Sequence, residues 1–164
     1  MKPTKTGAAF MQEIKDTHPP QGTVAVWLTG QASVILKGSQ VTVWIDPFVS
    51  DYLELKGGPA RAYPAPIVPE DVDQADICLI THEHDDHLDP ITVKAIASQN
   101  EHAVFVAPPC CEELLWKAGV KRERFVPAIT DEWKELGGSE SSPSLLRMNS
   151  LSLMRAATTD TWVI

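Results

Sequence analysis

Short runs of β-branched and aromatic residues dominate the first third of the chain and predict three strands. They cover residues 23–28, 33–37 and 41–45 and are separated by short turns that contain glycine. Because the connections are so short, we expect an antiparallel meander. A weaker helical pattern precedes the strands over residues 5–16 and ends at a His-Pro-Pro break.

The second part of the chain alternates between strand and helix patterns. Apolar runs predict strands at residues 76–81 and 103–107. Each is followed by a helix, one from the N-cap Asp89 to about Ser98 and one over residues 112–118. A meander followed by alternating strands and helices predicts an α/β sandwich.

Residues 46–69 have a different composition, since they hold five prolines and the pair Gly57-Gly58. This content predicts a long loop, followed by a short acidic helix near residues 70–74. Loops of this length are often functional, and we expect this one to lie near the site described below.

Composition narrows the class of protein. A length of 164 residues, 43% hydrophobic and 22% charged, is typical of one soluble domain or part of one, and no apolar run approaches a membrane span. The net charge of −8 argues against nucleic acid as a partner. The N-terminus has no secretory pattern, and three cysteines suggest no disulfide framework, so we expect a cytoplasmic location and a small-molecule substrate.

The segment from Thr81 to Asp89 holds three of the five histidines of the chain. It directly follows an expected strand, and side chains at the carboxyl end of such a strand commonly bind ligands. Imidazole nitrogens and carboxylate oxygens are the ligand types of zinc and similar divalent ions. The spacing does not fit a His-Glu-x-x-His helix, and the neighbouring cysteines Cys110 and Cys111 do not fit a deaminase.

The pattern His-x-His-x-Asp-His does match, and it is filled by His82, His84, Asp86 and His87. Together with Asp46 in Ile-Asp-Pro and the turn at residues 27–32, it resembles the metallo-β-lactamase superfamily of metal-dependent hydrolases. Over about residues 22–126 the chain resembles the branch that contains the L-ascorbate-6-phosphate lactonases. The fold implied is the αββα sandwich of that superfamily.

The resemblance implies a role for each matching residue. His82 and His84 would bind one metal ion, while Asp86, also counted as catalytic, and His87 would bind a second, either zinc or manganese. Asp46 would orient a ligand histidine. The implied reaction is hydrolysis of a small ester, lactone or phosphoester by a metal-activated water.

Residues outside this pattern receive ordinary interpretations. Glu83 and Asp85 are expected to be solvated, Asp89 to act only as a helix cap, and the adjacent cysteines to be buried or half-buried thiols. Surface positions are expected for His18 and His102, and core positions for Trp27 and Trp44.

The resemblance stops before the second half of the superfamily domain, which supplies further histidine and aspartate ligands. Residues 1–138 are therefore interpreted as the N-terminal half of such a domain. Apolar residues in the segment 139–164 follow neither the strand nor the helix period, so this segment is expected to be an aberrant or disordered tail. The codons compatible with it allow a second interpretation, in which the tail is a frame-shifted reading of a normal family sequence. The alternative hypothesis is thus a truncated, catalytically inactive chain that at most binds a metal ion. Its open sheet face would favour self-association.

Overall fold

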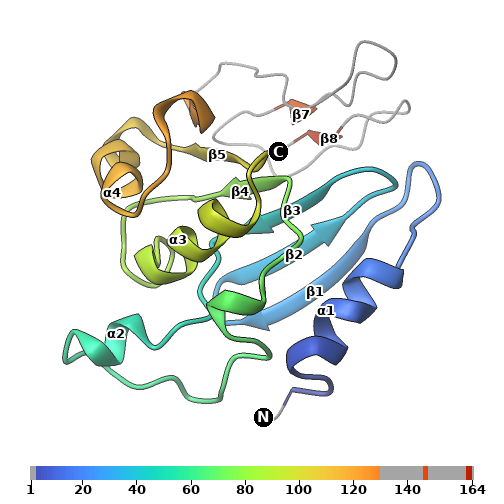
Figure 1. Ribbon diagram of the computed structural model, residues 1–164, viewed down its shortest axis with the longest axis horizontal. Coiled ribbons are helices and arrows are strands. Elements are labelled where there is room, and N and C mark those ends of the chain that lie inside the picture. Colours follow the sequence, from blue (N-terminus) through green and yellow to red (C-terminus); the bar gives the residue numbers. More distant parts are fainter. Residues whose placement is uncertain (1–2, 130–145, 148–161, 164) are drawn as a thin grey trace.

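A six-stranded sheet organises the chain in the computed structural model, which describes residues 3–129, 146–147 and 162–163 (Figure 1). The strands follow each other in sequence order across the sheet: β1 (Ala25–Gly30), β2 (Ser33–Lys37), β3 (Thr42–Ile45), β4 (Ile77–Leu79), β5 (Val104–Ala107) and β6 (Phe125–Pro127). β1, β2 and β3 are antiparallel, whereas β3, β4, β5 and β6 run parallel to one another. A separate parallel pair is formed by β7 (Leu146–Arg147) and β8 (Trp162–Val163).

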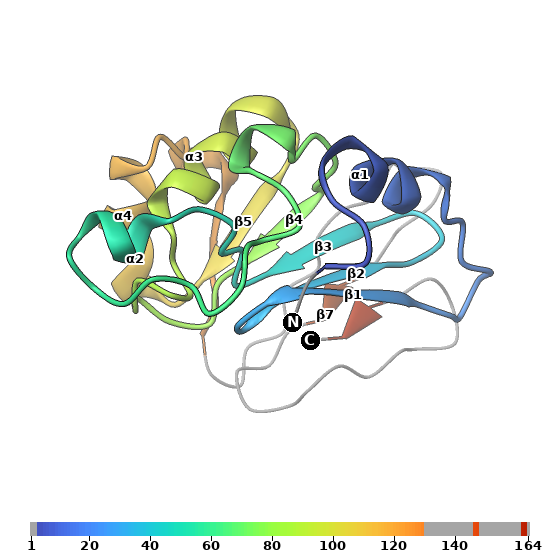
Figure 2. The ribbon, with the colours of Figure 1, turned by 90° about the horizontal axis from the view of Figure 1, so that it is seen from below.

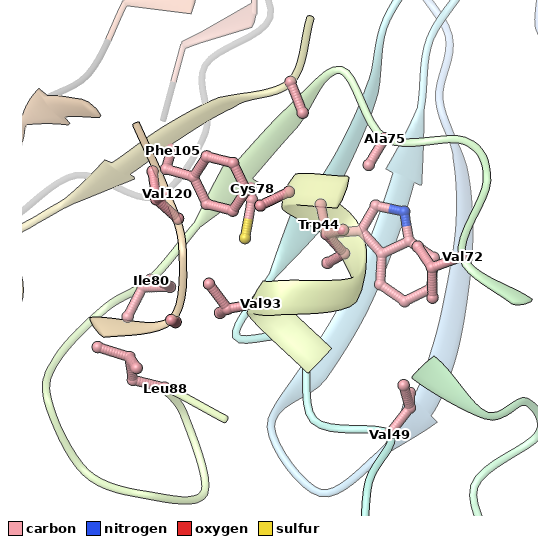
Figure 3. Close-up of a cluster of buried hydrophobic side chains, with 14 of the residues drawn as sticks. Trp44, Val49, Val72, Ala75, Cys78, Ile80, Leu88, Val93, Phe105 and Val120 are labelled. Atoms are coloured by element: carbon pink, nitrogen blue, oxygen red, sulfur yellow. The ribbon is translucent and has the colours of Figure 1, made fainter. Parts of the chain in front are cut away.

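Three helices contribute to the core on one face of this sheet (Figure 2): α1 (Gly7–Asp16), α3 (Pro90–Gln99) and α4 (Glu112–Lys117). They meet a row of side chains that crosses four paired strands, namely Ile35, Trp44, Cys78 and Phe105. All four are fully buried, and Figure 3 shows Trp44, Cys78 and Phe105 among the buried side chains. Successive residues of a strand point to opposite faces, so the row follows directly from the register of the pairing.

The opposite face of the sheet is also apolar. The residues one position away in each strand form a second cluster, which includes Leu36, Val43 and Ile77. An α/β sheet with two apolar faces belongs to a layered sandwich. On this face Val26 and Leu28 of edge strand β1 are 55% and 76% exposed, whereas Leu36 and Val43 are buried.

Most elements expected from the sequence are confirmed, including the meander, α1, α3 behind its Asp89 cap, and α4. The loop at residues 46–69 is less irregular than expected, because it contains the short helix α2 (Tyr52–Leu55), which ends where Gly58 N–H donates to Leu53 O. The expected acidic helix is only a 3₁₀ turn at Pro69–Asp71.

The predicted tail at residues 139–164 lies outside the described residues, apart from β7 and β8. The proposed boundary between residues 138 and 139 therefore stays a prediction. Across the described ranges, no helix combines the length and apolar character needed to cross a membrane.

Lys37 joins the sheet to the end of α1. Its ammonium is buried and donates to the carbonyl oxygens of Ile14 (2.6 Å) and Lys15 (3.1 Å), in the last turn of the helix. Burial lowers the pKa of Lys37. A cation at this position satisfies carbonyls that lack helical partners and complements the helix dipole.

We therefore expect Lys37→Met to lower the free energy of unfolding by about 1–2 kcal/mol, measured by urea denaturation. Lys15→Met is the matched control, because the Lys15 side chain makes an exposed ion pair with Asp73 and its loss should change stability by less than about 0.5 kcal/mol. Equal effects of the two variants would contradict the role assigned to Lys37.

Candidate metal centre

The histidine-rich loop lies at the carboxyl edge of the parallel strands. It begins directly after β4, and Asp46 comes directly after the neighbouring strand β3. Asp46 N–H donates to Leu79 O at 2.8 Å, so the end of β3 is held against the end of β4. The two chain segments that carry the predicted site therefore meet at one edge, although they are far apart in sequence.

The buried carboxylate of Asp46 accepts several hydrogen bonds at this edge of the sheet. Its Oδ1 accepts from Thr81 N (2.7 Å), and its Oδ2 accepts from Thr81 Oγ1 (2.8 Å) and lies 2.8 Å from His87 Nδ1. The backbone of Asp46 is left-handed, with φ at 45°. Because an ionised carboxylate only accepts, this contact corresponds to the His87 tautomer that carries its proton on Nδ1 and a lone pair on Nε2.

The four predicted ligands form two pairs. His82 Nε2 lies 3.1 Å from His84 Nδ1, and His87 Nε2 lies 3.8 Å from Asp86 Oδ2. The rings of His82 and His87 are tilted against each other with centroids 3.9 Å apart, so the two pairs are adjacent.

Each pair fits a shared divalent ion. Metal–ligand bonds of about 2.0–2.1 Å in tetrahedral geometry place two ligand atoms about 3.4 Å apart. The separations of 3.1 and 3.8 Å bracket that value. The pairs agree in proximity with those that the sequence resemblance implies, and the ligand roles themselves stay a prediction. Within the described residues, however, no three of these four side chains bring one ligand atom each within 4.8 Å of one another.

The side chains between the predicted ligands reach solvent, as expected, since Glu83 is exposed and Asp85 is partly exposed, but each also has a protein partner. Asp85 Oδ2 lies 2.5 Å from Lys56 Nζ, a contact that ties the end of α2 to the loop and raises the pKa of Lys56. Glu83 Oε2 accepts from Cys110 Sγ at 3.3 Å. Its own backbone N–H and, next, this thiol lower the pKa of Glu83.

The adjacent cysteines Cys110 and Cys111 differ in their exposure to solvent. Cys110 is exposed, contrary to the expectation of two buried or half-buried thiols, while Cys111 is fully buried. Burial raises the pKa of Cys111 to about 12, with a further contribution from Cys110. Both cysteines lie in the 3₁₀ turn Pro109–Cys111, and short sequence patterns do not reveal which of the two faces solvent.

Asp89 does more than cap α3, which corrects a second expectation. Its Oδ1 accepts from the N–H groups of Ile91 (3.0 Å) and Thr92 (3.3 Å), as a cap should. Its Oδ2 also accepts from Ser50 Oγ (2.6 Å), Ser50 N (3.2 Å) and Thr92 Oγ1 (2.5 Å). Asp89 is fully buried, so it fixes the helix behind the histidine loop to the start of the long loop.

Two further residues of this region were missed by sequence reasoning. Thr81 Oγ1 lies 2.9 Å from His82 Nδ1 in addition to its contacts with Asp46, so it supports the first predicted ligand of the loop. Arg61 donates to the carbonyl of Phe48 (2.8 Å) and packs over its ring, so it joins two parts of the long loop. The position of Thr81 next to the histidine motif could have indicated its role, whereas no sequence pattern around Arg61 indicates its contact with Phe48.

A cleft of about 730 Å³ lies away from these residues, between the N-terminal segment, strand β1 and the end of the long loop. Phe10, Trp27, Leu28 and Tyr63 are among the residues that line it, and none of the predicted metal ligands does. The cleft therefore provides no argument about the metal centre.

Comparison with known proteins agrees with the geometry. The family model described as beta-lactamase superfamily domain matches residues 26–147. The N-acyl-phosphatidylethanolamine-hydrolyzing phospholipase D 1 of Caenorhabditis elegans is 34% identical over 122 residues, which are 73% of this chain and 34% of that protein. The probable L-ascorbate-6-phosphate lactonase UlaG of Salmonella heidelberg is 27% identical over 143 residues, covering 73% of this chain and 40% of its own length.

Among solved structures, CmlA, a diiron beta-hydroxylase from Streptomyces venezuelae, is similar with a TM-score of 0.51 at 20% identity, over 74% of this chain and 23% of that one. This likeness concerns the fold alone. The chain spans two-fifths or less of the length of these relatives. The family match extends over most of the chain, includes both Asp46 and the histidine-rich loop, and agrees with the observed sheet. The chain therefore belongs to the metallo-β-lactamase superfamily.

Proposed function

We propose that this chain contributes to a metal-dependent hydrolase site that uses a metal-activated water on a small ester, lactone or phosphoester. The observation that carries the proposal is that the four predicted ligands lie as two close pairs at one edge of the sheet, His82 with His84 and Asp86 with His87. Zinc and manganese both accept nitrogen and carboxylate ligands of this kind. Divalent ions in such a site supply Lewis-acid stabilisation of an oxygen and activate water.

The residues around the ligands would keep them in place. Asp46 holds His87 through Nδ1, and Thr81 contacts both Asp46 and His82. Partners of this type orient a ligand ring and increase its basicity.

The relatives support the class of substrate. One is named for hydrolysis of a phospholipid, which breaks a phosphodiester bond, and the other for opening a phosphorylated lactone. Both reactions add water to a carbonyl or phosphoryl centre of an anionic molecule. We accordingly propose an anionic ester, lactone or phosphodiester as substrate. The cytoplasmic location and the exclusion of nucleic acid stay predictions from the sequence.

The test is hydrolysis of bis(p-nitrophenyl) phosphate and of a generic lactone by the full chain with Zn²⁺ or Mn²⁺. We expect His84→Ala to lower any metal-dependent rate at least about hundredfold, since it removes a ligand rather than a supporting partner. His102→Ala is the matched control, because His102 is exposed and is not among the predicted ligands, and it should leave the rate unchanged.

Equal rates for His84→Ala and the unaltered chain would contradict the proposal. Metal binding that depends on His84 without turnover of any of these substrates would instead support the alternative of a catalytically inactive chain that only binds a metal ion.

A further inference from the structure

A second group of ligand-type side chains lies beside the histidine loop. Cys110 and Cys111 lie in the 3₁₀ turn that follows β5, just as the histidine loop follows β4. Because β4 and β5 are parallel neighbours, both connections leave the same edge of the sheet. Glu83, between His82 and His84, accepts a hydrogen bond from Cys110 through its carboxylate.

The three side chains converge. Glu83, Cys110 and Cys111 each offer one ligand atom, and these atoms all lie within 4.8 Å of one another. Cys110 Sγ is 3.3 Å from Glu83 Oε2. Metal–sulfur bonds of about 2.3 Å and metal–oxygen bonds of about 2.0–2.2 Å place tetrahedral ligand atoms about 3.4–3.8 Å apart, so small side-chain movements would complete such a site.

The three side chains differ in exposure. Cys111 is fully buried, whereas Glu83 and Cys110 are exposed. Two of the three ligand groups are therefore accessible to an ion from solvent. The fourth position would remain open to solvent, as in sites with three protein ligands.

We propose that Glu83, Cys110 and Cys111 form a separate site for a thiophilic divalent cation such as Zn²⁺. Thiolates are soft ligands, whereas the neighbouring histidine pairs offer nitrogen and carboxylate oxygen, so the two sites select ions differently. The bound ion replaces the thiol protons of both cysteines, which pass to solvent. The Glu83 carboxylate favours metal binding over a disulfide between Cys110 and Cys111. Its anionic oxygen stabilises a cation and has no role in a disulfide.

The experiment is a titration of the full chain with Co²⁺, a spectroscopic substitute for Zn²⁺, under argon with a phosphine reductant. Thiolate ligation produces a sulfur-to-cobalt charge-transfer band in the near ultraviolet, which histidine ligation does not. We expect this band in the unaltered chain and its loss when Zn²⁺ is added. Cys110→Ser and Cys111→Ala should each abolish the band, and Glu83→Gln should weaken Co²⁺ binding at least about tenfold.

Two controls separate this site from the third thiol and from the histidine loop. Cys78→Ala removes the third thiol, which is buried in the core, and should keep the band. His82→Ala with His84→Ala should also keep it, so failure of the hydrolase proposal and failure of this one give different results. Far-ultraviolet circular dichroism verifies that Cys111→Ala is folded, and Cys110→Ser tests an exposed position that does not depend on core packing.

Absence of the band from the reduced, unaltered chain would overturn the proposal, as would a band that survives in Cys110→Ser. Loss of the band in the histidine double variant would also overturn it, because the cysteines would then belong to the histidine site.

Discussion

Replacing Asp89 by alanine is expected to lower the free energy of unfolding by about 3–5 kcal/mol. The carboxylate is fully buried and accepts five hydrogen bonds, two from the first turn of α3, one from the Thr92 hydroxyl and two from Ser50. Alanine removes the helix cap and leaves the buried Ser50 and Thr92 groups without this acceptor. Each such loss costs about 1–3 kcal/mol in mutational studies.

Urea denaturation followed by circular dichroism measures this change. Ser98→Ala, at the exposed end of the same helix, is the matched control and should stay within about 0.5 kcal/mol of the unaltered chain. A loss below about 1 kcal/mol for Asp89→Ala would show that Asp89 is no more than an ordinary cap.

Replacing Asp46 by asparagine is expected to weaken Mn²⁺ binding about 10–100-fold. An asparagine oxygen can still accept from Thr81 N–H. Its amide N–H₂ group can only donate, so His87 Nδ1 would have to accept and the ring proton would move to Nε2. The lone pair that faces Asp86 would then be lost from the neutral ring.

Mn²⁺ is the appropriate probe for this comparison, because it prefers oxygen and nitrogen ligands and avoids the proposed thiol site. Electron paramagnetic resonance of free Mn²⁺ gives the affinity. Asp73→Asn, which alters an exposed carboxylate paired with Lys15, should bind Mn²⁺ like the unaltered chain. Identical affinities for Asp46→Asn and Asp73→Asn would rule out an orienting role for Asp46.

Features that depend on neighbouring residues were predictable from the sequence. The strands β1, β2 and β3 follow from local patterns, and the cap and proline at the start of α3 are adjacent in the chain. The candidate site could be recognised in the sequence because His82, His84, Asp86 and His87 lie within six positions of one another.

Features that depend on distant residues were not predictable. Ser50 and Asp89 are 39 positions apart, and Glu83 and Cys110 are 27 positions apart, so no local pattern reports either contact. Asp89 therefore resembled a simple cap, and Cys110 a half-buried thiol. Helix α2 was missed because the prolines and glycines around it outweighed four helical residues.

The most direct measurement is the amount of Mn²⁺ that the chain retains after equilibrium dialysis, determined by elemental analysis for the unaltered chain and for the double variant His82→Ala, His84→Ala. If the histidine-rich loop is a metal centre, the unaltered chain retains Mn²⁺ and the double variant loses at least one ion per chain. Equal Mn²⁺ content in the two proteins would show that these histidines do not bind metal, and the hydrolase interpretation of this chain would be wrong.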